Sequence, residues 1–478
     1  MEDLLNLTIV QLHEGFQKKQ FTSVEVTKAY LEQIKKVDGK IDAYLLVTEK
    51  LALEMAEKAD KIIAKGGDFP MLCGVPFSVK DNILVEGEKA TGASTFLENY
   101  IAPYDATVIT KLRKQGAVIL GKVNMDDTAM GVSTENSAFK TTKNPHDLTR
   151  VPGGSSGGST ASIAAQEACF SLGSDTGGSI RLPSSFCGVV GLNPTYGAVS
   201  RHGLIAMASS LDQIGPMAKT VEDARIIFEA ISGKDSMDAT SADFKFQILN
   251  FKLRGARIGV PKEYFAEGID SEVEKIIRGA IKTAEDAGAK IVPISLPMTK
   301  YAIACYYIIV PSEVSANLSR LDGIKYGYSE TRNQKSEIRN LLDVYLKSRG
   351  ACFGPEPKRR ILIGTYALSS GYYDAYYKKA QEVRQLIRQD FAQAFEKVDV
   401  IFSPVSPTPA YKIGEKKDDP LAEYLMDVYT CPLKLAGLPA LSLPAGKIGA
   451  LPVGLQIIGN YFEEGKILSI AEAMEKLV

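Results

Sequence analysis

Short apolar runs alternate along the chain with stretches whose apolar residues recur every three or four positions. The runs predict buried strands at residues 75–79, 117–122, 256–261, 290–293 and 398–402. Between them, residues 107–114 and 270–287 have the apolar spacing of helices that pack one face against a sheet. This alternation of strand, helix and strand predicts an α/β fold with a largely parallel sheet.

Helical patterns extend over two longer parts of the chain. In the first, about residues 1–65, Thr22 and Glu25 have the spacing of a capping box, and apolar residues follow at helical intervals. In the second, about residues 300–395, helical stretches predominate. No clean linker or internal repeat interrupts the sequence. We therefore expect a single domain over residues 1–478, with an N-terminal helical segment and a peripheral helical region.

Composition narrows the class of protein. The 478 residues are 45% hydrophobic and 24% charged, as in a well-packed globular protein, so extensive disorder is not expected. Lys and Arg number 56 against 57 Asp and Glu, which gives a formal net charge of -1. A protein that grips nucleic acid directly usually has a basic excess or a basic stripe, and the sequence has neither.

The cysteines and the N-terminus bear on the compartment. The six cysteines are Cys73, Cys169, Cys187, Cys305, Cys352 and Cys431. They form no CxxC pair and no histidine tract accompanies them, so no metal site is expected. In a chain of this length they indicate reduced, mostly buried thiols of a cytoplasmic protein. The acidic N-terminus lacks the features of a signal peptide, and no run of 18 or more apolar residues predicts a membrane span.

Two segments rich in glycine and serine carry the strongest chemical signal. Residues 153–159 are Gly-Gly-Ser-Ser-Gly-Gly-Ser, and residues 175–181 are Asp-Thr-Gly-Gly-Ser-Ile-Arg. Glycine pairs let successive backbone N–H groups point at one place, where they bind an anion or a developing oxyanion. A phosphate loop would need a closing Gly-Lys-Ser or Gly-Lys-Thr, a dinucleotide turn would need GxGxxG, and both patterns are missing. A purely structural turn is the other alternative, which the serine in each segment disfavours.

A serine nucleophile needs a base, and the sequence offers few. The three histidines are His13, His146 and His202, and nothing in their surroundings favours a Ser-His-Asp triad, although that alternative stays open. Lys80 follows the predicted strand at residues 75–79. To act as a base near pH 7, its pKa must fall by roughly three units from about 10.4, which burial at an apolar strand end can cause. The alternative is that Lys80 forms an ion pair with an acid such as Asp81.

The order of Lys80, residues 153–159 and residues 175–181 resembles the amidase signature family, and the resemblance extends from about residue 74 to residue 456. It implies a large mixed, mostly parallel sheet that helices cover on both faces. It also implies a Ser-Ser-Lys triad, in which Ser179 is the nucleophile, Ser155 passes on its proton and Lys80 is the base. The backbone N–H groups that would form the oxyanion hole are those of Thr176, Gly177 and Gly178.

Three further stretches resemble one branch of this family, the glutamine-hydrolysing A subunits of tRNA-dependent amidotransferases. The stretches are residues 306–307 with 319–323, 358–361 and 369–379. The resemblance implies that Tyr306, Arg359 and Asp427 hold glutamine. Arginine suits the α-carboxylate, aspartate suits the α-ammonium, and tyrosine adds a hydroxyl donor. The alternative for each residue is an ordinary ion pair or a packed aromatic ring.

The resemblance also implies partners. The B and C subunits would complete a heterotrimer, in which the B subunit holds most of the misacylated tRNA. With ATP and Mg²⁺, the B subunit would use ammonia from this chain to convert Glu-tRNA(Gln) to Gln-tRNA(Gln), and some such complexes also convert Asp-tRNA(Asn) to Asn-tRNA(Asn). This chain itself would need no cofactor.

Two other functions compete with this one. The first is a stand-alone amidase that acts on a small or fatty amide, but a neutral amide offers no charges to match Arg359 and Asp427. The second is an assembly scaffold with a decayed site, against which the intact Lys80, Ser155 and Ser179 argue.

Overall fold

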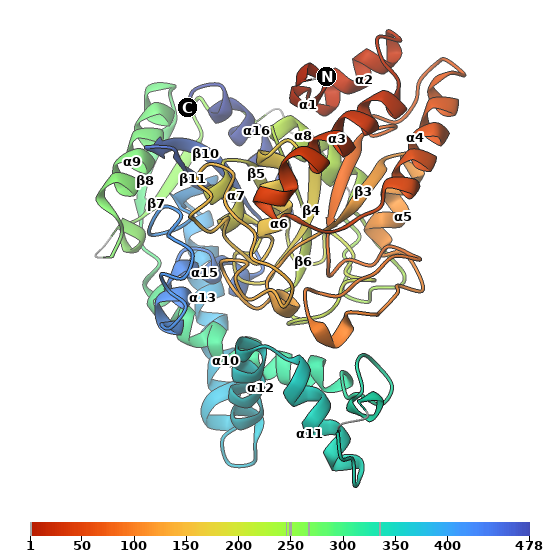
Figure 1. Ribbon diagram of the computed structural model, residues 1–478. Helices are drawn as coiled ribbons and strands as arrows, with labels where there is room; N and C mark the ends of the chain where they lie inside the picture. Colours follow the sequence, from red (N-terminus) through yellow and green to blue (C-terminus); the bar gives the residue numbers. More distant parts are fainter. Residues whose placement is uncertain (1, 245, 248–250, 266–267, 334–335) are drawn as a thin grey trace.

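The computed structural model describes residues 2–244, 246–247, 251–265, 268–333 and 336–478 (Figure 1). Within these residues, one sheet of eleven strands has the spatial order β1-β3-β2-β4-β6-β5-β10-β11-β9-β7-β8. The strands are β1 (Tyr44–Val47), β2 (Pro76–Lys80), β3 (Val118–Val123), β4 (Phe170–Asp175), β5 (Val190–Asn193), β6 (Gln213–Ala218), β7 (Arg257–Pro261), β8 (Lys290–Ile294), β9 (Val400–Pro404), β10 (Ala440–Ile448) and β11 (Leu451–Ile458). The five predicted strands are all present, as β2, β3, β7, β8 and β9.

The direction of the strands differs in part from the prediction. Among the described residues, six of the ten strand pairings are antiparallel, so the sheet is mixed, as predicted, but it is not mostly parallel. Parallel pairs are confined to β2 with β3 and β4, and to β7 with β8 and β9. The apolar runs do not encode direction. Short connections such as that between β10 and β11 impose antiparallel pairing, because a parallel return needs a long crossover.

Helices cover both faces of the sheet (Figure 1). They are α1 (Glu2–Asn6), α2 (Ile9–Gln17), α3 (Ser23–Ile41), α4 (Glu49–Ile63), α5 (Thr107–Lys114), α6 (Gly157–Ala164), α7 (Arg181–Cys187), α8 (Val221–Ile231), α9 (Ser271–Asp286), α10 (Ala302–Asn317), α11 (Leu341–Cys352), α12 (Pro355–Leu368), α13 (Lys379–Phe395), α14 (Pro420–Tyr424), α15 (Cys431–Ala436) and α16 (Glu464–Glu475). On one face α6 packs on β2 and β4, and the hydroxyl oxygens of Ser162 and Ser78 lie 3.0 Å apart. On the other face α8 packs on β6, where Ile214 and Phe228 belong to one apolar cluster.

The N-terminal segment is mainly helical, with one exception. The N–H of Glu25 donates to Thr22 Oγ1 (3.1 Å) and the N–H of Thr22 donates to Glu25 Oε2 (2.7 Å), so the predicted capping box is confirmed. The exception is β1, which pairs with β3 at the edge of the sheet although the pattern around it predicts helix. A strand of four residues is too short for its own periodicity to stand out between two long helices.

The residues between β8 and β9 form a helical region that projects from the sheet (Figure 1). Helix α10 packs on both α12 and α13, and α13 packs on α15. One apolar cluster contains Ile309 of α10 and Ile387 of α13 together with Met125, which follows β3, and Ile458 of β11. The N–H of Gly354, between α11 and α12, also donates to Asp127 Oδ2 (3.1 Å), so the helical region reaches the segment that follows β3.

The cysteines fit the reduced state that the sequence predicts. All six are unpaired and buried. Burial raises the pKa of the Cys73 thiol to about 11, so this thiol stays protonated near neutral pH. Among the helices of the described residues, none is long and apolar enough to cross a membrane.

Candidate active site

Lys80 is the last residue of β2, a strand that β3 and β4 flank on both sides, and its side chain is fully buried. Its Nζ lies 2.8 Å from Ser155 Oγ and 2.8 Å from Ser156 Oγ. It also lies 2.9 Å from Ser174 Oγ and 3.2 Å from the carbonyl oxygen of Ser174. All four neighbours are neutral oxygens, so Lys80 is hydrogen-bonded without being held in an ion pair.

This environment changes the proton affinity of Lys80. Burial lowers its pKa from 10.5 to about 7, although the more distant charges of Asp126, Asp175 and Asp212 favour the protonated form. The predicted alternative, an ion pair with Asp81, is wrong, because the Asp81 carboxylate binds Lys122 (Nζ–Oδ1 3.1 Å). Lys80 therefore exists partly as the neutral amine near pH 7.

Ser155 lies in the turn before α6, beneath tightly packed backbone, and the Gly154–Ser155 peptide bond is cis. A Cβ on Gly154 would lie 2.2 Å from Asp126 Oδ2 and 2.5 Å from the backbone N of Ser133. Only glycine leaves room for this approach. The glycine pair at residues 153–154 thus lets the chain bring Ser155 to Lys80.

Ser179 lies in the turn between β4 and α7, and 8% of its surface is exposed, whereas Ser155 is fully buried. The N–H of Ser156 donates to the carbonyl oxygen of Ser179 (3.2 Å), so the two glycine- and serine-rich segments meet. Within the part of the chain that the structure describes, the hydroxyl of Ser179 makes no hydrogen bond. The predicted order of Lys80, Ser155 and Ser179 therefore runs from the interior toward the surface.

The turn that precedes Ser179 presents unused backbone donors. Among the contacts of the described residues, the N–H groups of Thr176, Gly177 and Gly178 have no protein acceptor. Two other groups of these residues are occupied. Thr176 Oγ1 donates to Asp212 (2.6 Å), and the carbonyl oxygen of Gly178 accepts from Leu182 N (2.8 Å). Free N–H groups in succession form the kind of concavity that binds an oxyanion.

Arg181 holds this turn from the protein interior. It is fully buried and holds Asp175 through two bonds, Nε–Oδ2 of 3.0 Å and Nη2–Oδ1 of 3.1 Å. It also donates to the carbonyl oxygen of Gly177 (3.0 Å) and to Gln456 Oε1 (2.7 Å). A bidentate guanidinium–carboxylate pair with its remaining donors satisfied sets the geometry of the loop that it spans.

Tyr306 and Asp427, two predicted glutamine contacts, border the same turn. A Cβ on Gly177 would lie 2.6 Å from the Tyr306 hydroxyl, and a Cβ on Gly178 would lie 2.7 Å from Asp427 Oδ1. Both side chains are almost completely buried. Burial and the nearby charge of Asp175 raise the pKa of Asp427 to about 7. Among the described residues, the one side-chain partner of this carboxylate is the hydroxyl of Thr430 (3.2 Å). A cation next to Asp427 would therefore stabilise its charged form.

Arg359 lies farther out than these two residues. Its side chain is 40% exposed and pairs with Glu356, whereas the side chain of Arg360 is 3% exposed and donates to Glu356 Oε1 (2.7 Å). Burial raises the pKa of both Asp427 and Tyr306, and the positive charge of Arg360 partly opposes that rise. The role predicted for Arg359 stays a prediction, and the structure adds Arg360 as a second, buried candidate. Two adjacent arginines give no sign in the sequence of which one faces inward.

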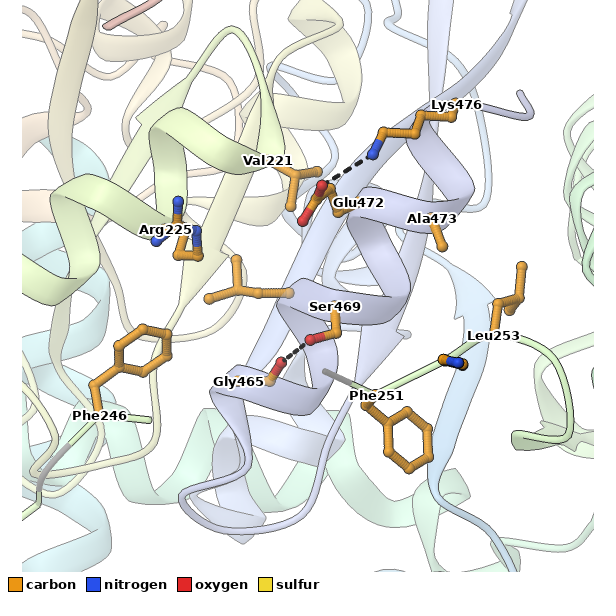
Figure 2. Close-up of a pocket in the computed structure, with 12 residues that line it drawn as sticks. Val221, Arg225, Phe246, Phe251, Leu253, Gly465, Ser469, Glu472, Ala473 and Lys476 are labelled. Atoms are coloured by element: carbon orange, nitrogen blue, oxygen red, sulfur yellow. Dashed lines mark hydrogen bonds and ion pairs between the residues drawn. The ribbon is translucent and has the colours of Figure 1, made fainter. Parts of the chain in front are cut away.

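The histidines and a hollow beside α16 lie apart from this site. His146 Nε2 is 3.0 Å from the carbonyl oxygen of Cys187, His202 contacts Thr107, and His13 contacts Gln17. Over the described ranges, no hydrogen bond joins a histidine to either serine. A hollow of about 540 Å³ lies between α8, α16 and the segment around Phe251 (Figure 2). Its lining contains none of the predicted site residues.

Comparison with known proteins shows the family to which the chain belongs. The family model described as Amidase matches residues 25–468, and the chain belongs to this family. It is 56% identical to the A subunit of glutamyl-tRNA(Gln) amidotransferase from Caldanaerobacter subterraneus subsp. tengcongensis, over 99% of this chain and 97% of that protein. It is 42% identical to the solved structure of the A subunit of glutamyl-tRNA(Gln) amidotransferase from Thermotoga maritima, with a TM-score of 0.81 over 99% of this chain and 95% of that one. The peptide amidase of Stenotrophomonas maltophilia is more distant in sequence, at 28% identity and a TM-score of 0.80 over 98% of this chain and 96% of that one.

Proposed function

We propose that this chain is the glutamine-hydrolysing subunit of a tRNA-dependent amidotransferase, with Ser179 as nucleophile. The observation that carries the proposal is the contact between Ser155 and Lys80, whose pKa is about 7, beside a turn with free N–H groups. Ser179 attacks the side-chain amide carbon of glutamine, its proton passes to Ser155, and Ser155 passes its own proton to Lys80. The N–H groups of residues 176–178 stabilise the oxyanion.

The same proton path, used in reverse, completes the reaction. The protonated Lys80 returns its proton through Ser155 to the leaving nitrogen, and ammonia departs. Water then hydrolyses the acyl-enzyme, with Lys80 again as the base, and glutamate is released. A base whose pKa lies near the working pH suits both directions of transfer.

Recognition of glutamine follows from the charges around the turn. Asp427 binds the α-ammonium, Tyr306 adds a hydroxyl donor, and an arginine of α12 binds the α-carboxylate. Arg359 and Arg360 are the two candidates for that arginine. A neutral amide would leave the buried Asp427 carboxylate without a cation and one of the two guanidinium charges beside Glu356 uncompensated, which disfavours a stand-alone amidase.

The ammonia is used elsewhere. In the assembled enzyme the B and C subunits complete a heterotrimer, and the B subunit uses ATP and Mg²⁺ to activate Glu-tRNA(Gln) or Asp-tRNA(Asn). Support comes from the names of relatives at 56% and 42% identity, each of which is called an A subunit. The net charge of -1 fits a chain that leaves most of the tRNA contact to its partner.

Ammonium rescue tests the division of labour. The assembled complex with Ser179→Ala is expected to lose Gln-tRNA formation with glutamine as donor and to keep it with ammonium chloride. The measurement is Gln-tRNA formed with each donor, and the wild-type complex is the control. Failure of ammonium rescue in an intact complex would contradict the proposal, as would amidation of tRNA by this chain alone.

A matched pair of variants distinguishes the roles of the two arginines. The arginine that binds the α-carboxylate is expected to show, on change to Ala, a rise of about 10–100-fold in KM for glutamine. Its effect on n-butyramide, which is glutamine without its α-amino and α-carboxylate groups, is expected to be much smaller. Equal losses on both substrates for Arg359→Ala and Arg360→Ala would remove both residues from the carboxylate site.

A further inference from the structure

One buried carboxylate, Glu356, lies where the segments that carry the predicted glutamine contacts meet. Its Oε2 accepts from Arg359, and its Oε1 accepts from Arg360 Nε (2.7 Å) and from the hydroxyl of Tyr424 (2.8 Å). Arg359 and Arg360 belong to α12, and Tyr424 ends α14, three residues before Asp427. One side chain thus joins the segment that carries the two arginines to the segment that carries Asp427.

Aromatic rings extend this junction to α10. The ring of Tyr424 stacks on that of Tyr307, with 3.8 Å between centroids and 22° between planes. The Arg360 guanidinium lies over both rings, 5.2 Å from the centroid of Tyr307 and 5.7 Å from that of Tyr424. Tyr307 follows Tyr306 in α10, so the third predicted glutamine contact is tied to the same group.

Opposite charges hold Glu356 and the two arginines together. Burial opposes ionisation of Glu356, but its contacts with Arg360, Tyr424 and Arg359 outweigh that effect and hold its pKa below the usual value. The carboxylate is therefore charged at neutral pH. It neutralises one of the two guanidinium charges and leaves one for an incoming α-carboxylate.

We propose that Glu356 is the positioning residue for glutamine recognition. It sets the distance between the arginine that binds the α-carboxylate and the aspartate that binds the α-ammonium, without touching the substrate. This inference rests on the proposed function. It goes beyond it by assigning specificity for an α-amino acid to one buried side chain outside the reacting groups.

The test separates positioning from folding. Glu356→Gln keeps the size of the side chain and an acceptor for Arg360, but it loses the charge that holds both arginines. We expect KM for glutamine to rise about 10–100-fold, kcat to change less than about 3-fold, and hydrolysis of n-butyramide to stay near the wild-type level. Tyr424→Phe removes only the hydroxyl and is expected to raise KM for glutamine a few-fold. The assay uses the assembled complex.

The control is Asp343→Asn, which breaks another carboxylate–arginine pair of the helical region, with Arg339 (Asp343 Oδ2–Arg339 Nε 3.0 Å). It is expected to leave the ratio of kcat/KM for glutamine to that for n-butyramide unchanged. Equal losses on glutamine and n-butyramide in both Glu356→Gln and Tyr424→Phe would overturn the inference. Lack of glutamine hydrolysis by the wild-type complex would instead overturn the proposed function, so the two failures are distinguishable.

Discussion

Lys80 and Lys122 lie at the ends of neighbouring parallel strands, and the sheet places them in opposite chemical settings. In the register of β2 and β3, Val79 is opposite Lys122 and Lys80 is opposite Val123. Both lysines are fully buried. Lys80 has only hydroxyl and carbonyl oxygens around its Nζ, whereas Lys122 contacts the Asp81 carboxylate (3.1 Å) and the carbonyl oxygen of Lys89 (3.2 Å).

The difference shows that the partner of a buried lysine decides what its burial costs. Beside a carboxylate, the two opposite charges compensate each other. A buried ammonium next to neutral oxygens lacks that compensation, and its pKa falls. Three predictions separate the two settings, and they run from the largest expected effect to the smallest.

The first prediction concerns activity. Lys80→Met is expected to lower kcat for glutamine hydrolysis by about 10³–10⁴-fold, because the general base is lost while the apolar stem is kept. The protein should stay folded, since the change removes a costly buried amine. Activity is measured by release of glutamate, and folding by circular dichroism. A variant that keeps more than a tenth of wild-type kcat would show that the base is another group.

The second prediction concerns stability. Lys122→Met is expected to cost about 3–5 kcal/mol in free energy of unfolding, because it leaves the buried Asp81 carboxylate without an opposite charge. The measurement is urea denaturation. The double variant with Asp81→Asn should recover part of the loss, and a double variant no more stable than Lys122→Met would mean that the ion pair is not what stabilises this strand end.

The third prediction uses pH to read Lys80 in the folded state. Its folded pKa of about 7 is below the unfolded value of about 10.4, so the unfolded chain binds more protons between these values. Burial of Lys80 therefore lowers the free energy of unfolding by its full amount below pH 7, and this loss of stability disappears as pH rises toward 10.4. Stability of the wild type relative to Lys80→Met should therefore rise by about 2 kcal/mol from about pH 7.5 to about pH 9, as measured by denaturation of both. A constant difference would mean that Lys80 does not titrate there.

The elements that the sequence predicts correctly are those that depend on local pattern. Lys80 at a strand end, the glycine pairs beside Ser155 and Ser179, and the capping box of Thr22 are all encoded within a few residues. What the sequence does not provide is what the fold brings together from far apart. Asp81 is adjacent to Lys80 in sequence but pairs with Lys122, because the strand alternates its side chains between two faces.

Substrate recognition shows the same limit. Arg359 and Arg360 differ by one helical position, and the contacts of α12 with α10 and α14 bury Arg360 and leave Arg359 partly exposed. Glu356, spaced three and four residues before them, has the spacing of a helical ion pair, but on an exposed helix such a pair would stabilise only weakly. The direction of the strands was predicted wrongly for a related reason, since an apolar run has the same pattern in parallel and in antiparallel pairs.

The bond from Arg181 to Gln456 also bears on how the protein matures during synthesis. The two residues are 275 positions apart, and Arg181 also donates to the carbonyl oxygen of Gly177 in the turn that carries Ser179. After residues 153–159 and 175–181 have left the ribosome, more than half of the chain must still be synthesised before β11 can join the sheet. Contacts at such separation form late, because long loops must close first. We therefore expect the growing polypeptide to carry the proposed nucleophile, Ser179, for some time without this support, and hydrolytic activity to appear only after β11 has joined the sheet.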